Sequence, residues 1–254
     1  MAFLEVRNLG KTYVTRLGAC RVQALKDVSF SVEKGEFIAV MGESGSGKTT
    51  LLNILAALDR PGSGDVLLEG KSLSGIAEKG LAAFRRDNIG FLFQDFNLLD
   101  TFNVRDNILL PLVLKRTGIK QMEERLMPVV KQLGLAELLD KYPYELSGGQ
   151  KQRTAAGRAI ITSPALLLAD EPTGALDSHQ AQRLMELFCR LNDGGQTVIM
   201  VTHSVKAASY ASRVLFLRDG QVFHQLCRGD KSAFDMQGQI SDALSMVLAG
   251  EENE

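Results

Sequence analysis

The chain has 254 residues, of which 45% are hydrophobic and 23% charged, the composition of an ordinary globular protein with one large or two small domains. Its 29 basic and 30 acidic residues give a net charge of −1, which excludes the basic excess typical of nucleic-acid-binding proteins. The widely spaced Cys20, Cys189 and Cys227 fit a reducing cytosol. The first residues do not read as a signal peptide, and no apolar run approaches ~20 residues, so we expect a soluble chain, for which any membrane role would need a partner.

Strand-like patterns begin the chain. Residues 2–7 and about 22–32 alternate between apolar and polar positions, and Tyr13 lies between them. The apolar positions of the second segment share one face, which Lys26 interrupts: Ala24, Val28, Phe30 and Val32. Residues 37–41 then predict a buried strand, and residues 49–58 predict a helix.

Between that strand and that helix lies Gly42-Glu43-Ser44-Gly45-Ser46-Gly47-Lys48-Thr49, which fits the phosphate-binding pattern G-x-x-x-x-G-K-[ST]. Its glycines let backbone N–H groups surround a phosphate, and the positive end of the helix dipole points at the same anion. Lys48 is suited to the β- and γ-phosphates of ATP, and the Thr49 hydroxyl is suited to Mg²⁺. A Gly/Ser-rich turn with an exposed lysine is the alternative. The predicted nucleotide-binding residues here are Gly42, Glu43, Ser44, Gly45, Ser46, Gly47, Lys48, Thr49 and Thr50.

After the turn signal at residues 59–64, strands are predicted at residues 65–70 and 88–94, the second ending at Gln94. A mainly helical stretch follows, from about 102 to 162. Helical spacing is clearest at Met122, Leu126, Val129, Val130 and Leu133. Pro128 lies inside this pattern and is expected to kink or split the helix.

The second half continues the alternation of strands and helices. Strands are predicted at residues 165–170, 197–202 and, as a hairpin around Asp219-Gly220, at 213–218 and 221–223. Residues 177–193 predict an amphipathic helix with these inward positions: Ala181, Leu184, Met185, Phe188 and Leu191. The last thirty residues suggest an appended helix carrying Phe234, Ile240, Leu244 and Val247, followed by a frayed acidic tail. This alternation predicts an α/β fold with a mostly parallel sheet, into which residues of about 95–162 insert a helical subdomain.

Two carboxylates, Asp170 and Glu171, follow the buried strand at 165–170. In P-loop enzymes an aspartate at such a strand end holds Mg²⁺, and the next carboxylate can accept a proton from the attacking water. Adjacent carboxylates resist ionising together unless a cation is near, and Mg²⁺ would be that cation. The alternative is an exposed acidic turn before Pro172.

The pentapeptide Leu146-Ser147-Gly148-Gly149-Gln150 combines a helix-capping serine with two glycines that expose N–H groups at the start of a predicted helix, residues 150–162, and so offers a second anion site. With a P-loop before it and the acidic strand after it, the chain resembles the ATP-binding-cassette (ABC) family over residues 2–225. The resemblance implies a P-loop NTPase fold with a parallel core sheet, an antiparallel β subdomain and the inserted helical subdomain. It assigns residues 2–227 to an ABC ATPase domain and residues 228–254 to a helical extension and acidic tail.

The resemblance also implies roles for single residues. Ser147, Gly148, Gly149 and Gln150 would bind the γ-phosphate held by the P-loop of a second copy, in a head-to-tail dimer enclosing two ATP molecules. Tyr13 resembles the aromatic residue that stacks on adenine, although a simple surface tyrosine is the alternative. Gln94 resembles the glutamine that touches Mg²⁺ and the attacking water, and His203 resembles the switch histidine that contacts Glu171. The implied catalytic residues are Glu171, His203, Lys48 and Gln94, and the implied metal ligands are Thr49, Gln94 and Asp170.

Residues 94–99 and 169–174 resemble the group that serves lipoprotein release, macrolide export and peptide-antibiotic resistance, and residues 97–101, 107–112, 149–159 and 172–177 resemble its bacitracin-export type. The resemblance implies an ATPase at the cytoplasmic face of the cell membrane, paired with a large integral membrane permease and often with a sensor histidine kinase. Residues of about 95–116 are the expected permease dock, although their apolar side chains could equally form subdomain core. The alternatives are the ATPase of a lipoprotein-release, macrolide-export or cell-division-type complex, a non-transport cassette ATPase, and a regulatory nucleotide-binding subunit.

Overall fold

The computed structural model describes residues 2–14 and 21–251, with side chains described up to Met246. The predictions for Cys20, for the Val247 side chain and for the tail residues 252–254 lie outside this part of the chain. Cys189 and Cys227 are free thiols. No helix of residues 2–14 and 21–251 combines the length and the apolar character that a membrane span requires.

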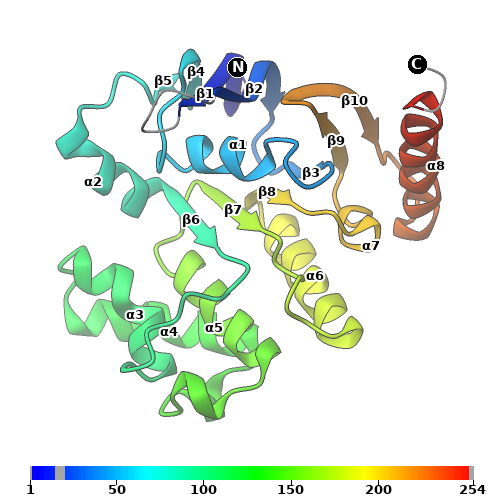
Figure 1. The fold of residues 1–254 in the computed structure, drawn as a ribbon. Helices are drawn as coiled ribbons and strands as arrows, with labels where there is room; N and C mark the ends of the chain where they lie inside the picture. The colour runs from blue at the N-terminus through cyan, green and yellow to red at the C-terminus, as the bar shows by residue number, and fades with distance from the viewer. Residues whose placement is uncertain (1, 15–20, 252–254) are drawn as a thin grey trace.

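The described strands form two sheets (Figure 1). One sheet is antiparallel and has the order β2-β1-β4-β5, with β1 at Leu4–Val14, β2 at Arg21–Val32, β4 at Ser63–Leu68 and β5 at Lys71–Ser72. The other has the order β10-β9-β3-β8-β7-β6, with β3 at Phe37–Met41, β6 at Ile89–Leu92, β7 at Leu166–Asp170, β8 at Thr197–Val201, β9 at Arg213–Arg218 and β10 at Gln221–Cys227. All neighbours from β9 to β6 are parallel, and β10 is antiparallel to β9. The predicted fold class is confirmed.

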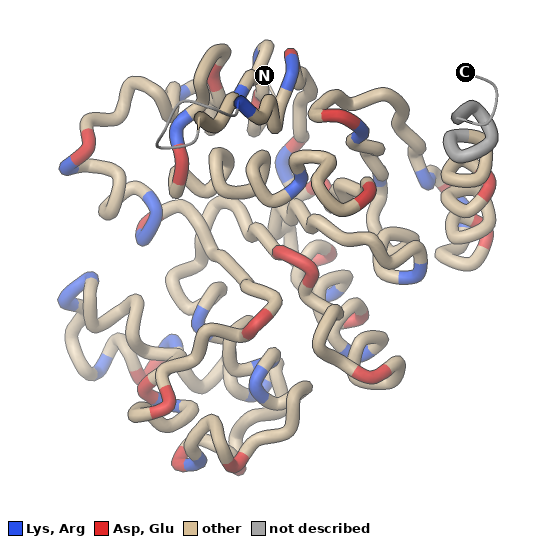
Figure 2. The backbone as a smooth tube through the Cα atoms, in the orientation of Figure 1, with Lys and Arg blue, Asp and Glu red and all other residues tan. Residues whose placement is uncertain are grey.

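The helices are α1 at Lys48–Leu55, α2 at Glu78–Asn88, α3 at Val104–Leu114, α4 at Ile119–Leu133, α5 at Gly148–Ile160, α6 at Ser178–Asp193, α7 at Val205–Ala208 and α8 at Ala233–Glu251, with short 3-10 turns at Ala136–Leu138 and Pro143–Glu145. Figure 1 shows α3, α4 and α5 gathered in a block beyond β6, while α8 lies at the opposite end of the molecule near β10 and α7. Basic and acidic residues are interspersed along the fold (Figure 2), in keeping with the net charge of −1.

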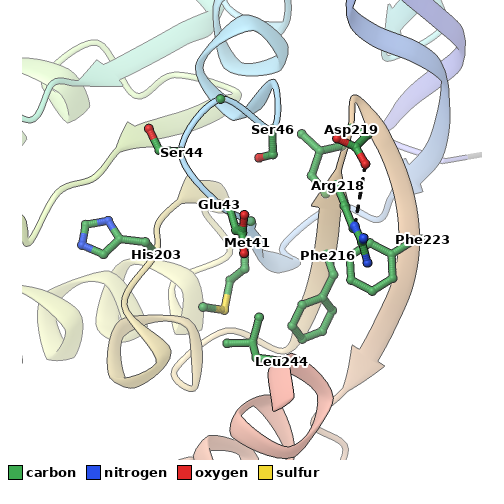
Figure 3. Close-up of a pocket in the computed structure, with 13 residues that line it drawn as sticks. Met41, Glu43, Ser44, Ser46, His203, Phe216, Arg218, Asp219, Phe223 and Leu244 are labelled. Atoms are coloured by element: carbon green, nitrogen blue, oxygen red, sulfur yellow. Dashed lines mark ion pairs between the residues drawn. The ribbon is translucent and has the colours of Figure 1, made fainter. Parts of the chain in front are cut away.

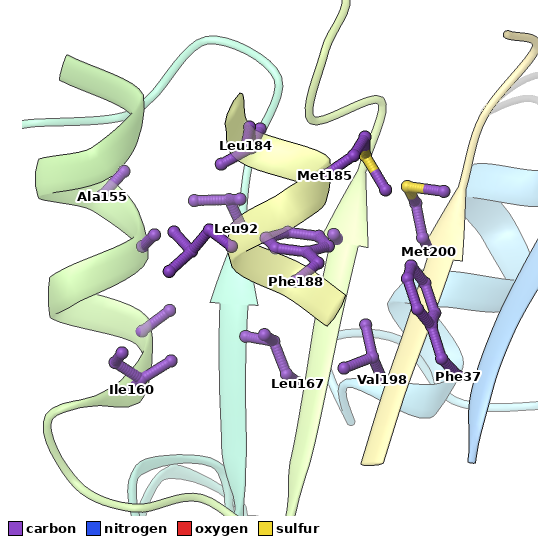
Figure 4. Packing of buried hydrophobic residues seen from close by; sticks show 14 of the residues in the cluster. Phe37, Leu92, Ala155, Ile160, Leu167, Leu184, Met185, Phe188, Val198 and Met200 are labelled. Carbon is purple, nitrogen blue, oxygen red and sulfur yellow. The ribbon is translucent and has the colours of Figure 1, made fainter. Parts of the chain in front are cut away.

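The parallel sheet separates two hydrophobic clusters, and its strands alternate between them. In β3, Phe37, Ala39 and Met41 face the cluster shared with α5 and α6, where Phe37 packs edge-on against Phe188 (Figure 4). Ile38 and Val40 face the other cluster, which includes α1. Both faces are therefore buried, which explains why the sequence of β3 is apolar at every position.

Several sequence predictions differ from the structure in detail. Tyr13 lies inside β1, because the first strand runs to Val14. The P-loop helix ends at Leu55 rather than at residue 58, because Ala57 takes a left-handed conformation with φ +54°. A left-handed Asp27, φ +51°, shifts the alternation of β2, so that Leu25 is buried and Ala24 is only half-buried.

Pro128 does not split α4, which continues from Ile119 to Leu133. Both Pro128 and Glu124, whose carbonyl loses its helical N–H partner, are exposed, so water can satisfy that carbonyl. A further difference concerns α8, where Met236 and Ile240 are buried but Phe234 is 83% exposed. Residues 234 and 236 are two positions apart and so lie on nearly opposite faces of a helix.

Candidate functional site

The P-loop connects β3 to α1 and is shaped so that only glycine fits at key positions. A Cβ atom on Gly42 would lie 2.1 Å from the Leu217 carbonyl oxygen, and one on Gly47 would lie 2.3 Å from the Ala24 carbonyl oxygen. Gly47, at φ +102°, is the residue before α1. The buried Ser46 Oγ has no hydrogen-bond partner in the described residues. Backbone N–H groups that no side chain covers at a helix N-terminus, together with an unpaired hydroxyl, are suited to bind a phosphate group.

Lys48 is buried and lies across this loop. Its Nζ donates to the Gly42 carbonyl at 2.8 Å and to the Glu43 carbonyl at 2.6 Å. Burial lowers the pKa of Lys48, although the carboxylates of Glu171, Asp170 and Glu43 oppose that shift. An ammonium has three N–H donors, so these two bonds leave one donor for a ligand.

Asp170 and Glu171 follow at the end of β7, close enough to Lys48 for their charges to interact. Burial raises the pKa of Asp170, the neighbouring Glu171 raises it further, and Lys48 partly opposes both. Glu171 itself has a left-handed backbone, φ +43°, and its N–H donates to the Val201 carbonyl at 2.9 Å. The site thus holds two adjacent carboxylates and one buried lysine, an arrangement that fits a divalent cation.

His203 pairs with Glu171 from the end of β8. The His203 Nδ1 lies 2.9 Å from Glu171 Oε1, and the His203 backbone N–H donates to Glu171 Oε2 at 3.3 Å. The His203 side chain is 72% exposed and that of Glu171 only 14%. Both carboxylate oxygens are therefore oriented by one residue, while the imidazole faces open space where a ligand can enter.

A cavity of about 420 Å³ adjoins the P-loop on the side of the β9–β10 hairpin and α8 (Figure 3). Glu43 and Ser44 form its P-loop wall, His203 lies at one end, and Phe216 and Leu244 form part of its apolar floor. Leu244 comes from α8, so the last helix reaches the flank of the P-loop.

Ser147 begins α5 as predicted. Its Oγ accepts from the Gln150 N–H at 3.4 Å, and the Gln150 Oε1 accepts from the Ser147 N–H at 2.8 Å, which is a capping box. A Cβ on Gly149 would lie 2.0 Å from Gln180 Oε1. The absence of a side chain at Gly149 therefore lets Gln180, on α6, pack against the start of α5. Within one chain, this segment belongs to the helical block, whereas the P-loop lies between β3 and α1 (Figure 1).

Gln94 lies two residues beyond β6, and a Cβ on Gly174 would lie 3.2 Å from its Nε2. The fold therefore brings Gln94 to the loop that follows Glu171. Tyr13 is separate from this group. It lies at the end of β1, and its hydroxyl donates to Asp59 Oδ2 at 2.7 Å.

The sequence reasoning missed two residues that hold parts of this site. Asp59 lies in the predicted turn at residues 59–64, yet its carboxylate accepts a hydrogen bond from the Tyr13 hydroxyl. Arg158, on α5, donates from Nη1 to the Asn97 carbonyl at 2.6 Å and from Nη2 to the Phe96 carbonyl at 2.9 Å. Asp59 and Arg158 are distant in sequence from what they bind, and nothing in their local pattern signals these contacts.

A groove of about 250 Å³ separates α2 from α3 and passes beside Arg158; it is termed the α2–α3 groove here. Side chains of residues 95–116 divide between the core and the groove. Ile108 and Leu112 are fully buried in the core, whereas Leu110 and Leu114 line the groove. The other apolar lining residues include Leu58, Phe91 and Phe93.

Comparisons with known proteins agree with this geometry. The family model described as "ABC transporter" matches residues 25–174. The ABC transporter ATP-binding protein YxdL of Bacillus subtilis (strain 168) is 50% identical over 252 residues, which cover 99% of this chain and 96% of that protein. The bacitracin export ATP-binding protein BceA of Halalkalibacterium halodurans is 49% identical over 255 residues and the full length of both.

A solved structure is similar over most of the fold. It is the dimeric, post-hydrolysis state of the ATP-binding cassette MJ0796, from Methanocaldococcus jannaschii, bound to ADP and Pi. The TM-score is 0.80 at 38% sequence identity, and the match covers 88% of this chain and 98% of that chain.

Proposed function

The chain belongs to the ABC transporter family as an ATP-binding and ATP-hydrolysing subunit, and from that premise we propose that it drives an integral membrane permease in the export of, or protection from, peptide antibiotics of the bacitracin kind. One observation carries the substrate class: the 49% identity to a bacitracin export ATP-binding protein spans 100% of both chains. The subunit would act at the cytoplasmic face of the membrane, with residues 2–227 as its ATPase domain and residues 228–254 as an extension.

In this proposal the P-loop binds the triphosphate and Lys48 neutralises its β- and γ-phosphates. Thr49, Asp170 and Gln94 hold Mg²⁺, which when bound neutralises charge on the phosphate oxygens. The raised pKa of Asp170 supports this role, because a buried carboxylate beside Glu171 gains most from a nearby cation. Glu171 accepts the proton of the attacking water, and His203 keeps its carboxylate oriented through the 2.9 Å contact.

The proposed active form is a head-to-tail dimer. Ser147, Gly148, Gly149 and Gln150 present helix N–H groups in a part of the chain distinct from its P-loop, so they are available to the nucleotide of a second copy. The similar cassette MJ0796 has a dimeric structure. Tyr13, half-exposed at the end of β1, stacks on the adenine. The nucleotide binds the closed dimer more tightly than the open one, which allows ATP to move a permease seated in the α2–α3 groove.

Turnover in this proposal is tested by Glu171→Gln. The amide keeps the shape of the site and cannot act as the base, so we expect hydrolysis to fall by at least about a hundredfold and an ATP-dependent dimer to accumulate. Size-exclusion chromatography with light scattering, with and without ATP, measures both dimer and monomer. An unchanged hydrolysis rate would remove Glu171 from the role of base.

The transport role is tested by isolating the tagged full-length chain from membranes and identifying the proteins that accompany it. A large permease with an extracellular domain, with or without a sensor histidine kinase, supports the proposal. A small four-span permease or a division protein would move the chain to a lipoprotein-release or cell-division-type complex. Recovery of no membrane protein would overturn the transport role.

A further inference from the structure

Three side chains around the end of α1 form a polar cluster outside the catalytic group. Asp59 follows α1 and uses each carboxylate oxygen for a different donor: Oδ1 accepts from Lys11 Nζ at 2.6 Å, and Oδ2 accepts from the Tyr13 hydroxyl at 2.7 Å. Lys11 Nζ also donates to the Arg60 carbonyl at 2.7 Å and lies 5.0 Å from the centroid of the Tyr13 ring. The cluster thus joins β1 to the P-loop helix.

This cluster fixes the aromatic ring rather than burying it. The side chains of Lys11 and Asp59 are 15% and 29% exposed, whereas Tyr13 remains 41% exposed. The Tyr13 hydroxyl also makes a side-chain hydrogen bond with Thr50, on α1. Burial would raise the pKa of Asp59, but the bonds from Lys11 and Tyr13 outweigh it and hold that pKa below its ordinary value. The carboxylate is therefore ionised at neutral pH, and the cluster stays intact.

A tyrosine on a strand end ordinarily samples several rotamers, and a ligand that stacks on it must first select one. Here the hydroxyl and one ring face are already engaged, so only the exposed face is left to a ligand. A cation over one face also draws electron density from the ring, which favours stacking of an electron-rich purine on the other.

We propose that Asp59 and Lys11 are positioning residues that pre-order Tyr13 as a platform for a purine base, and that they set how much of the nucleotide affinity comes from the base. The inference rests on the proposed function of Tyr13 as the adenine-stacking residue and goes further, to the residues that make the ring competent. It requires no contact between Asp59 or Lys11 and the nucleotide.

The test compares two ligands, Mg·ATP and Mg·tripolyphosphate, because the second has the phosphates and lacks the base. Binding to the full-length chain is measured for Asp59→Ala, Lys11→Met and Tyr13→Phe, with Tyr13→Ala as the limit. We expect the three variants to bind ATP about three- to tenfold more weakly, the loss that follows from one ordering hydrogen bond. Tripolyphosphate affinity should stay within about twofold of the wild type.

A double variant separates positioning from other effects. In a Tyr13→Ala chain, adding Asp59→Ala should change ATP affinity no further, because the ring that Asp59 orders is gone. Glu78→Ala is the matched control, since it removes an exposed ion pair with Arg60 in the same region without touching Tyr13. Asp59→Asn serves in place of Asp59→Ala if the alanine variant does not fold.

Each outcome decides the point. Equal losses for ATP and tripolyphosphate would mean that the cluster supports the P-loop helix, and no loss for either would leave the cluster without a role in binding; both overturn the inference. If Tyr13→Ala itself leaves the ratio of the ATP and tripolyphosphate affinities unchanged, the proposed adenine role of Tyr13 is wrong. The inference about Asp59 and Lys11 is then overturned as well, and the Tyr13→Ala result distinguishes this case from the two above.

Discussion

Replacing Arg158 with glutamine should release the loop that follows Gln94. Arg158 reaches from α5 to the carbonyls of Phe96 and Asn97, at 2.9 and 2.6 Å, and no carboxylate in the described part of the chain pairs with it. Phe96 and Asn97 have left-handed backbones, with φ +61° and +48°. Burial lowers the pKa of Arg158, yet a guanidinium stays charged at neutral pH. Arg158 thus bonds to two consecutive residues whose backbone conformations are unfavourable.

The magnitude follows from these two opposing contributions. Hydrogen bonds from a charged donor are worth about 1.5–3 kcal/mol each, or about 3–6 kcal/mol for the pair. Left-handed residues other than glycine cost about 1–2 kcal/mol each, or about 2–4 kcal/mol together. Without Arg158 the loop relaxes and recovers that strain, so we expect Arg158→Gln to lower the free energy of unfolding by only about 1–2 kcal/mol. The larger effect is local opening of the loop.

Urea unfolding measures the global change, and hydrogen exchange over residues 94–99 measures the local one. We expect exchange in that loop to accelerate in Arg158→Gln while exchange in β3 and β8 tracks global stability alone. Arg105→Gln is the control, because it removes an exposed arginine paired with Glu123. Slow exchange retained in the loop of Arg158→Gln would refute the argument, since other contacts would then hold the two carbonyls.

Three further predictions concern Asp170 and two residues at the start of α5, Gly149 and Ser147. Asp170→Asn should stabilise the nucleotide-free chain at neutral pH, because burial and Glu171 raise the pKa of Asp170 and so disfavour its charged form in the folded state. The gain in stability should disappear as the pH falls and the wild-type carboxyl becomes protonated. Thermal melts at a series of pH values would measure this change. Gly149→Ala should lower the free energy of unfolding by about 0.5–1.5 kcal/mol, because the new Cβ displaces the Gln180 side chain and breaks its 2.6 Å hydrogen bond to Asp177. In that variant, adding Gln180→Ala should lower the stability measured by urea unfolding no further, and an additive loss would contradict the contact. Ser147→Ala should lower the free energy of unfolding by about 0.5–2 kcal/mol, because it removes the helix cap, whereas Ser147→Asp should retain the cap. Equal unfolding midpoints for these two variants would show that the cap is not what stabilises α5.

The parts of the site that the sequence predicted are those whose chemistry is local. The P-loop requires its glycines and Lys48 within a few positions, and β3 is apolar throughout because both of its faces are buried. The capping box of Ser147 and Gln150 likewise needs only one helical turn.

The parts that it missed depend on partners distant in the chain or on single backbone angles. Tyr13 meets Asp59, 46 positions later, and Arg158 meets Asn97, 61 positions earlier. Asp27 takes a left-handed conformation, which changes the side chains of β2 that face the core. Aspartate tolerates this conformation but does not require it, so the sequence does not predict it. Helix α2 has Leu81 as its buried residue, so its sequence gives little apolar periodicity to detect.

The left-handed backbone of Glu171, φ +43°, has a consequence for how this position evolves. Glycine or asparagine would suit that backbone better than glutamate, so the requirements of chain folding and of the water activation that we propose for Glu171 diverge at this one residue. A library of variants selected only for resistance to heat should accumulate glycine or asparagine at position 171, whereas selection for ATP turnover should keep glutamate. The backbone angle thus marks a residue type that the local conformation alone does not favour.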